Sequence, residues 1–174
     1  MEERQLGEAR AAMDEPQRDE LYMWEVLELA ELAAGVGEMP IAALAVYEDE
    51  IIARAINEKE ARQDATFHAE LLALQAAADE LGRWRLKDVT LYCNLEPCPM
   101  CAGAMVNSRL GTLVYGSDDP KAGAAGSIID LVRYPGLNHH LQVRRGVLEA
   151  ECQALLSDYF SNLREEKKAK KKKE

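Results

Sequence analysis

One histidine, one glutamate and two cysteines are spaced so that they could hold a metal ion and move protons beside it. The sequence contains His68-Ala69-Glu70 and, further along, Pro97-Cys98-Pro99-Met100-Cys101. An imidazole and two thiolates suit zinc, and catalytic zinc sites use three protein ligands whereas structural sites usually use four. Because the fourth group here is a carboxylate, the set favours a catalytic, hydrolytic zinc site.

Glu70 is the candidate for proton transfer at this site. Zinc lowers the pKa of water bound to it, and a nearby carboxylate can accept a proton and deliver it to a ring nitrogen and a leaving amine. The chemistry indicated is addition of water to an amidine-like carbon, followed by loss of ammonia. The alternative is a structural site whose fourth ligand is His139, His140 or Cys93.

Helices and strands that alternate along the chain must bring these residues together. Hydrophobic spacing predicts one helix from Pro16 to about Gly35, and others over residues 68–81, 97–108 and 148–163. Strands are predicted over residues 41–47, 51–56, 89–93, 113–115 and 141–144, a polar loop over 57–65, and one or two helical turns over 128–132. This alternation predicts an α/β layered domain with a central five-stranded sheet. His68 and the cysteine pair then lie where helices begin, and the positive ends of the helix dipoles stabilise thiolates there.

The length of 174 residues fits one domain, which we place at residues 16–163. Residues 1–15 are predicted to be an acidic extension without a fixed fold. Residues 164–174, with seven bases and three acids, are predicted to be a solvated lysine-rich tail. The net charge of −10 makes the body a poor general surface for nucleic acid, so a polyanion would need a local basic rim or this tail.

Composition also bears on the cellular location. No apolar run approaches the roughly 18 residues of a membrane span, and the N-terminus lacks a secretory pattern. We therefore expect a cytoplasmic protein without membrane contact. In a reducing compartment Cys93 and Cys152, which have no partner spacing, are expected to be small buried apolar residues.

Several further segments resemble the bacterial tRNA adenosine deaminases, the TadA family. The histidine–glutamate motif and the Pro-Cys-x-x-Cys motif alone would also fit cytidine, deoxycytidylate or guanine deaminases. The matching segments include Leu95–Met105, Lys121–Ser127, Leu137-Asn138-His139 and Leu155–Phe160. Of these, the loop Lys121–Ser127 and the pair Asn138-His139 narrow the resemblance to the tRNA adenosine deaminases. The resemblance covers about residues 20–170.

This resemblance implies a three-layer cytidine-deaminase-like fold, with helices on both faces of a five-stranded mixed sheet. It further implies one Zn²⁺ per subunit, a homodimer, and conversion of adenosine to inosine at the wobble position of a tRNA anticodon loop. The matching zinc ligands are His68, Cys98 and Cys101, and the matching proton shuttle is Glu70. Asn57 matches a substrate contact of the family, and Asp119, Lys121, Tyr159 and Phe160 are expected contacts. The alternatives are that Asn57 is a turn residue, that Asp119 and Lys121 lie in a solvated loop, and that the two aromatic residues belong to the core.

Residues that depart from the family pattern include Ala42, Ile56, Phe67, Asn94 and Asp118. They indicate either repacking in a divergent relative or an altered substrate pocket, with Phe67 and Asn94 nearest the ligand motifs. Two other functions therefore stay open. One is deamination of a free base, a nucleoside or single-stranded DNA, and the other is a non-catalytic zinc-containing RNA-binding subunit. Glu70 argues against the second, because an inactive subunit does not need a proton shuttle.

Overall fold

A five-stranded sheet forms the middle layer of the computed structural model, which describes residues 9–10 and 12–172. The strand order is β2-β1-β3-β4-β5, with β1 antiparallel to both neighbours and β3, β4 and β5 mutually parallel. The strands are β1 (Ala42–Tyr47), β2 (Glu50–Ile56), β3 (Thr90–Leu95), β4 (Thr112–Ser117) and β5 (Gln142–Arg145). The predicted mixed sheet of five strands is confirmed.

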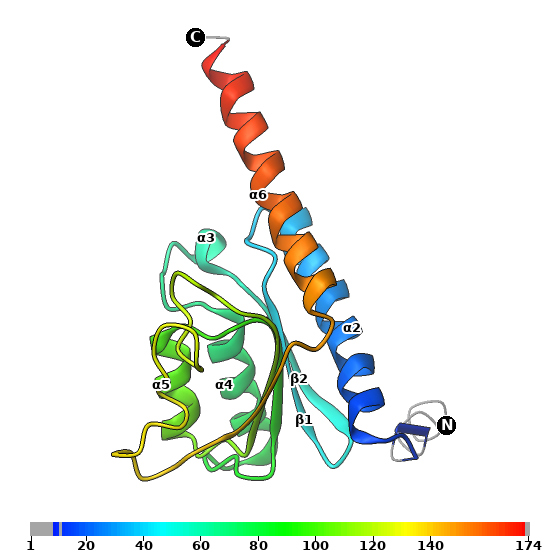
Figure 1. Cartoon of the computed structure of the whole chain (residues 1–174), viewed down its shortest axis with the longest axis vertical. Helices are drawn as coiled ribbons and strands as arrows, with labels where there is room; N and C mark the ends of the chain where they lie inside the picture. The colour runs from blue at the N-terminus through cyan, green and yellow to red at the C-terminus, as the bar shows by residue number, and fades with distance from the viewer. Residues whose placement is uncertain (1–8, 11, 173–174) are drawn as a thin grey trace.

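Helices cover both faces of this sheet (Figure 1). Helices α4 and α5 pack on one face, and α2 and the first part of α6 pack on the other. The helices are α2 (Glu15–Gly35), α3 (Lys59–Arg62), α4 (Ala69–Leu81), α5 (Pro99–Asn107) and α6 (Glu149–Lys171). None of the helices in the described part of the chain is both long and apolar enough to cross a membrane.

Both faces of the central strands are buried because their apolar side chains alternate between the two helical layers. On β3, Leu91 and Cys93 belong to the core beneath α4 and α5, whereas Tyr92 belongs to the core beneath α2. The expected burial of the two unpaired cysteines is also confirmed, since Cys93 and Cys152 are each 0% exposed. The two cores fix the sheet between its helices, and with it the helix starts that carry the ligand motifs.

Three local predictions are wrong. Residues 128–132 form bends, one turn and one isolated bridge rather than helical turns. The segment 57–65 is not a continuous loop, because it contains the short helix α3. Helix α6 does not end at Leu163 but continues to Lys171, so the lysine-rich segment is helical. Residues 164–171 contain no glycine or proline and are mostly good helix formers, so nothing in them stops the helix. Most of the acidic N-terminal extension lies outside the described residues.

Candidate active site

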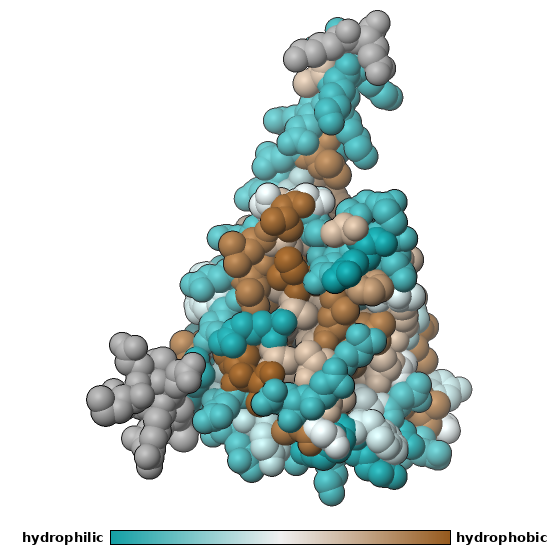
Figure 2. All heavy atoms as spheres, turned by 180° about the vertical axis from the view of Figure 1, so that it is seen from behind, coloured by the Kyte–Doolittle hydropathy of each residue, from teal (hydrophilic) through white to brown (hydrophobic). Residues whose placement is uncertain are grey.

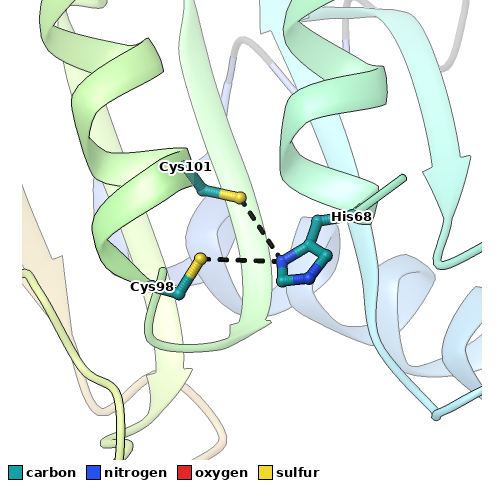
Figure 3. Close-up of side chains that lie close together, drawn as sticks. All are labelled: His68, Cys98 and Cys101. Carbon is teal, nitrogen blue, oxygen red and sulfur yellow. Dashed lines mark hydrogen bonds between the residues drawn. The ribbon is translucent and has the colours of Figure 1, made fainter. Parts of the chain in front are cut away.

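His68, Cys98 and Cys101 converge on one point between the starts of α4 and α5 (Figure 3). The Nδ1 atom of His68 lies 3.6 Å from each cysteine Sγ atom, and the three ligand atoms lie within 4.8 Å of one another. Tetrahedral zinc, with Zn–S of about 2.3 Å and Zn–N of about 2.0–2.1 Å, holds nitrogen and sulfur about 3.6 Å apart. The donor types and their spacing therefore fit a zinc ion.

Two helix starts supply these ligands, as predicted. His68 is the N-cap of α4 and Cys98 is the N-cap of α5, so both precede the first turn with an extended backbone. Hydrogen bonding from Cys101, together with that from His68, lowers the pKa of the Cys98 thiol to about 4, although burial acts in the opposite direction. Cys98 is thus favoured as the thiolate, which is the form of cysteine that binds metal, whereas the same hydrogen bond and burial raise the pKa of the Cys101 thiol.

Glu70 lies beside the ligands and is buried, with 4% of its surface exposed. Its Oε2 atom has no hydrogen-bond partner within the described residues. Burial is the main reason that the pKa of this carboxyl is raised to about 7. The extended N-cap backbone of His68 allows a residue only two positions further along to reach the same place. A buried carboxylate oxygen without a protein partner is costly, and its retention here is typical of a group kept for proton transfer.

The proposed structural alternative, with a fourth protein ligand, does not fit the geometry. Nε2 of His139 donates to the carbonyl oxygen of Leu110 at 2.6 Å, and Nε2 of His140 donates to that of Tyr134 at 3.0 Å. Cys93 lies in the core beneath α4 and α5. None of the three joins the ligand group, which contains three residues among those that the structure describes. This set matches a catalytic rather than a closed structural site.

Asn57 is buried next to the segment that carries His68. Its side-chain Nδ2 donates to Oε2 of Glu38 at 3.2 Å, and Glu38 also accepts the backbone N–H of Ala61 at 2.7 Å. The following residue, Glu58, donates its backbone N–H to the carbonyl oxygen of Phe67, directly before the histidine ligand. Sequence reasoning missed Glu38, whose carboxylate orients the Asn57 amide and is itself 2% exposed.

Glu96 is a second organising carboxylate that sequence reasoning missed. It is 1% exposed, and its oxygens accept backbone N–H groups from Asp119 at 2.9 Å, Ala125 at 2.9 Å and Ser127 at 3.0 Å, as well as the Ser127 hydroxyl. A Cβ atom at Gly123 would collide with this carboxylate, so glycine is required there. The only signal in the sequence is an acid directly after a buried strand. Glu96 holds the loop between β4 and β5 against the start of α5.

The other predicted substrate residues fall into two groups. Asp119, Lys121 and Phe160 line one groove of about 260 Å³ between this loop and α6. Tyr159 instead lines a groove of about 280 Å³ against α2, and it is only partly exposed. Phe160 is 40% exposed, so it is available for contact, whereas Tyr159 has the position of a residue that packs helix against helix.

Asn94 and Phe67, the departures nearest the ligand motifs, have different surroundings. Asn94 is fully buried, and its side chain accepts the backbone N–H of Ala42 at 3.0 Å and donates to the carbonyl oxygen of Pro40 at 2.8 Å. It therefore joins β3 to the start of β1, and the suggestion that it reshapes a pocket is wrong. Phe67 is half-buried with the Arg62 guanidinium 5.5 Å from its ring centre.

The remaining departures are two apolar residues of the core layer beneath α2 and one exposed acid. Ala42 is fully buried in the core beneath α2, and Ile56 packs against the same core. Asp118 is exposed in the loop after β4 and lines the groove that contains Lys121. Repacking accounts for the first two, and only Asp118 faces a groove.

This chain is similar to known deaminases. The family described as MafB19-like deaminase matches residues 17–164. A tRNA-specific adenosine deaminase of Bacillus subtilis (strain 168) is 48% identical over 155 residues, which are 89% of this chain and 96% of that protein. The similarity spans the ligands, Glu70 and the loop held by Glu96.

Solved structures agree with this relationship. A structure from work on A-to-I editing by tRNA:A34 deaminases at the wobble position is 37% identical with a TM-score of 0.74, and covers 77% of this chain and 97% of that one. A guanine deaminase from Nitrosomonas europaea is 27% identical with a TM-score of 0.70, covering 80% and 83%. With its three-layer fold and its histidine, cysteine and glutamate geometry, the chain belongs to the tRNA adenosine deaminase family of the cytidine-deaminase superfamily.

Proposed function

We propose that this protein hydrolyses the 6-amino group of adenosine at the wobble position of a tRNA anticodon, yielding inosine and ammonia. The observation that carries the proposal is the buried Oε2 atom of Glu70, which has no partner among the described residues and lies beside a three-residue ligand set. The 48% identity to a tRNA-specific adenosine deaminase supports adenosine in tRNA as the substrate.

Zn²⁺ is the metal that we assign to His68, Cys98 and Cys101, because their donor types and the 3.6 Å nitrogen–sulfur distances suit it. Bound there, zinc would lower the pKa of water toward neutrality. Glu70 takes up one proton from the attacking water on its free oxygen and delivers it to a purine ring nitrogen. It then carries a second proton, from the hydroxyl group added to the purine carbon, to the leaving amine, so that ammonia departs and the carbonyl of inosine forms. The enclosing protein keeps this carboxylate away from bulk solvent, so the proton stays at the site.

An anticodon loop is a suitable substrate because its bases are single-stranded. Turning a base out of such a loop costs less than extracting it from a duplex. We assign the Asn57 amide, held by Glu38, to the flipped nucleoside. Asp119, Lys121 and Phe160 line the groove between the β4–β5 loop and α6, where we place the flanking nucleotides of the loop.

We also propose that the protein is a cytoplasmic homodimer. Support for the dimer comes from large apolar side chains exposed at the start of α5 and in the β4–β5 segment. These are Met100 (36% exposed), Ile128 (54%), Ile129 (43%), Tyr134 (56%) and Leu137 (38%). The cytoplasmic location follows from the proposed substrate, because tRNA is processed there.

The test is replacement of Glu70 by glutamine, with inosine formation measured in an anticodon stem-loop that carries adenosine at its first anticodon position. We expect about one zinc per chain to be retained and the rate to fall about 100- to 10,000-fold, the usual contribution of general acid–base catalysis. Glu80→Gln, an exposed carboxylate on the same helix, is the matched control. Near-normal turnover by the Glu70 variant would overturn the mechanism.

Deamination of a free base is the second candidate, and the fold similarity to a guanine deaminase favours it. Incubating the wild-type protein separately with the stem-loop, adenosine, cytidine and guanine separates the two functions. Inosine in the stem-loop alone supports our proposal. Turnover confined to a free base would replace it with the second candidate.

A further inference from the structure

Helix α6 projects well beyond the body of the protein, as Figure 1 shows. Every residue from Arg164 to Lys172 is exposed, and hydrophilic side chains cover most of this projection (Figure 2). Between Phe160 and Lys171 the helix rises about 16 Å at 1.5 Å per residue. The lysine-rich segment therefore presents its charges on a rigid rod instead of a random tail.

Four of the bases on this rod share one side, which carries none of the rod's acids, whereas Lys170 and Lys172 lie outside that side. Successive residues of an α-helix turn by about 100°, so side chains at spacings of three, four, seven and eleven share a face. By this spacing one sector of about 100° contains Phe160 and four bases, Arg164, Lys167, Lys168 and Lys171. We call these five residues together the basic face. The nearby acids Asp158, Glu165 and Glu166 fall outside that sector.

The surroundings of α6 confirm this segregation. A groove of about 490 Å³ is lined by Phe160, Arg164 and Lys167 of the basic face and by Lys121 of the loop that Glu96 holds. The groove against α2 is lined instead by Asp158 and Glu166, among others. The basic face therefore looks toward the substrate loop, and the acidic side looks toward α2.

The basic groove lies next to the groove that contains Asp119, whose backbone N–H bonds to Glu96, two positions before the ligand Cys98. Lys121 and Phe160 line both the 490 Å³ groove and the 260 Å³ groove that contains Asp119. The chain as a whole carries a net charge of −10, so this face is a local exception that suits a polyanion. A nucleic acid whose single-stranded loop enters the site would extend its paired region along α6.

We propose that the basic face of α6 binds the phosphate backbone of the double-stranded anticodon stem. This inference rests on the proposed function, and it adds a second contact region beyond the loop whose adenosine reacts. Arg164, Lys167, Lys168 and Lys171 neutralise successive phosphates without reading base sequence, and Lys121 joins this contact to the loop-binding groove.

The test compares two double variants that remove the same charge from the same helix. Lys167→Gln/Lys171→Gln removes two positive charges from the basic face, whereas Lys170→Gln/Lys172→Gln removes two positive charges that lie outside its sector. Dissociation constants are measured between 50 and 200 mM salt for a full-length tRNA with adenosine at the wobble position. A single-stranded oligonucleotide of the anticodon-loop sequence serves as the second ligand.

Each lost phosphate contact reduces the slope of log affinity against log salt by about 0.9 for a duplex. For two contacts, the wild-type affinity for tRNA should fall about tenfold further across this salt range than that of the basic-face variant. The other double variant should follow the wild type, and the loop oligonucleotide should bind all three proteins alike. In steady-state assays the basic-face variant should show a raised KM for tRNA and an unchanged kcat.

Equal salt slopes for the two double variants would overturn the proposal, because they would indicate a general charge effect or none. Weaker binding of the loop oligonucleotide by the basic-face variant alone would place these lysines at the loop instead of the stem. The basic face could instead dock on the acidic body of a second copy of the chain. The basic-face variant would then change the sedimenting mass of the protein and keep the wild-type slope of log tRNA affinity against log salt, and this result would also overturn the proposal. Failure of the proposed function is distinct, because it appears as absence of inosine with the wild-type protein.

Discussion

Glu96→Gln tests whether one buried carboxylate holds the loop between β4 and β5 in place. Glutamine is nearly isosteric, but it offers one acceptor oxygen where glutamate offers two. Placing the amide nitrogen at the Oε2 position preserves the bonds from Ala125 and Ser127 and leaves the backbone N–H of Asp119 without an acceptor. The substitution therefore removes a specific contact to the loop without creating a cavity.

The expected loss of stability follows from these bonds. One partly buried N–H left unpaired costs about 1–3 kcal/mol, and hydrogen bonds that lose a charged acceptor weaken by about 1 kcal/mol each. Burying a neutral amide is easier than burying a charge, which offsets part of this. We expect a net decrease of about 2–4 kcal/mol in the free energy of unfolding, a large share of the 5–15 kcal/mol typical of a domain.

The pH dependence gives a second measure of the same contact. Burial by itself raises the pKa of Glu96, but hydrogen bonds from Ser127, Asp119 and Ala125 outweigh it and lower the pKa below its usual 4.5. A lowered folded pKa contributes stability that is present above the unfolded value and is lost as the pH falls through the folded value. Glu96→Gln should lack this part of the acid sensitivity.

The assay is urea unfolding at pH 7 and at pH 4, combined with steady-state deamination of the stem-loop. KM should rise more than kcat falls, since the loop carries Asp119 and Lys121 but not the zinc ligands or Glu70. Glu80→Gln is again the exposed control. A Glu96 variant with stability within about 0.5 kcal/mol of the wild type, the level of an ordinary surface substitution, and an unchanged KM would refute the reasoning.

Three further outcomes are expected. Asn94→Ala leaves two buried backbone groups at the start of β1 unpaired and should cost about 2–5 kcal/mol in urea unfolding, so a loss below 1 kcal/mol would contradict the assigned contacts. The pKa of Tyr22 is raised to about 12, mainly by burial, so the stability that its protonated form contributes is complete below pH 10 and is lost as the pH rises to 12. Between pH 9 and pH 11.5 the free energy of unfolding should fall by up to about 2 kcal/mol less in Tyr22→Phe than in the wild type. Equal falls in the two proteins would argue against this contribution. Cys101→Ser should abolish deamination and reduce bound zinc, measured by elemental analysis, to well below one per chain. Cys152→Ser changes a cysteine buried on the other face of the sheet and should retain zinc. Equal zinc contents in the two variants would remove Cys101 from the site.

Local patterns were sufficient to predict much of the fold and the centre of the site. The five strands and four long helices follow from apolar periodicity and from turn residues, because each pattern is contained within a short window. The ligand set also follows from local spacing, since His68 and Cys98 each begin a helix. The end of α6 differs from the prediction because the charge of residues 164–171 favours a solvated tail, whereas these residues include no glycine or proline that would stop the helix.

The sequence by itself determined the donor chemistry: one imidazole, two thiolates and a carboxylate are intrinsic to their residue types and require no partner to be recognised. Only the tertiary structure decided which other polar residues organise the site. Glu38, Asn94 and Glu96 are buried with hydrogen-bond partners that come from other segments of the chain. Whether such a residue faces solvent, a pocket or a backbone N–H depends on how the layers pack, and that packing is a property of the whole chain.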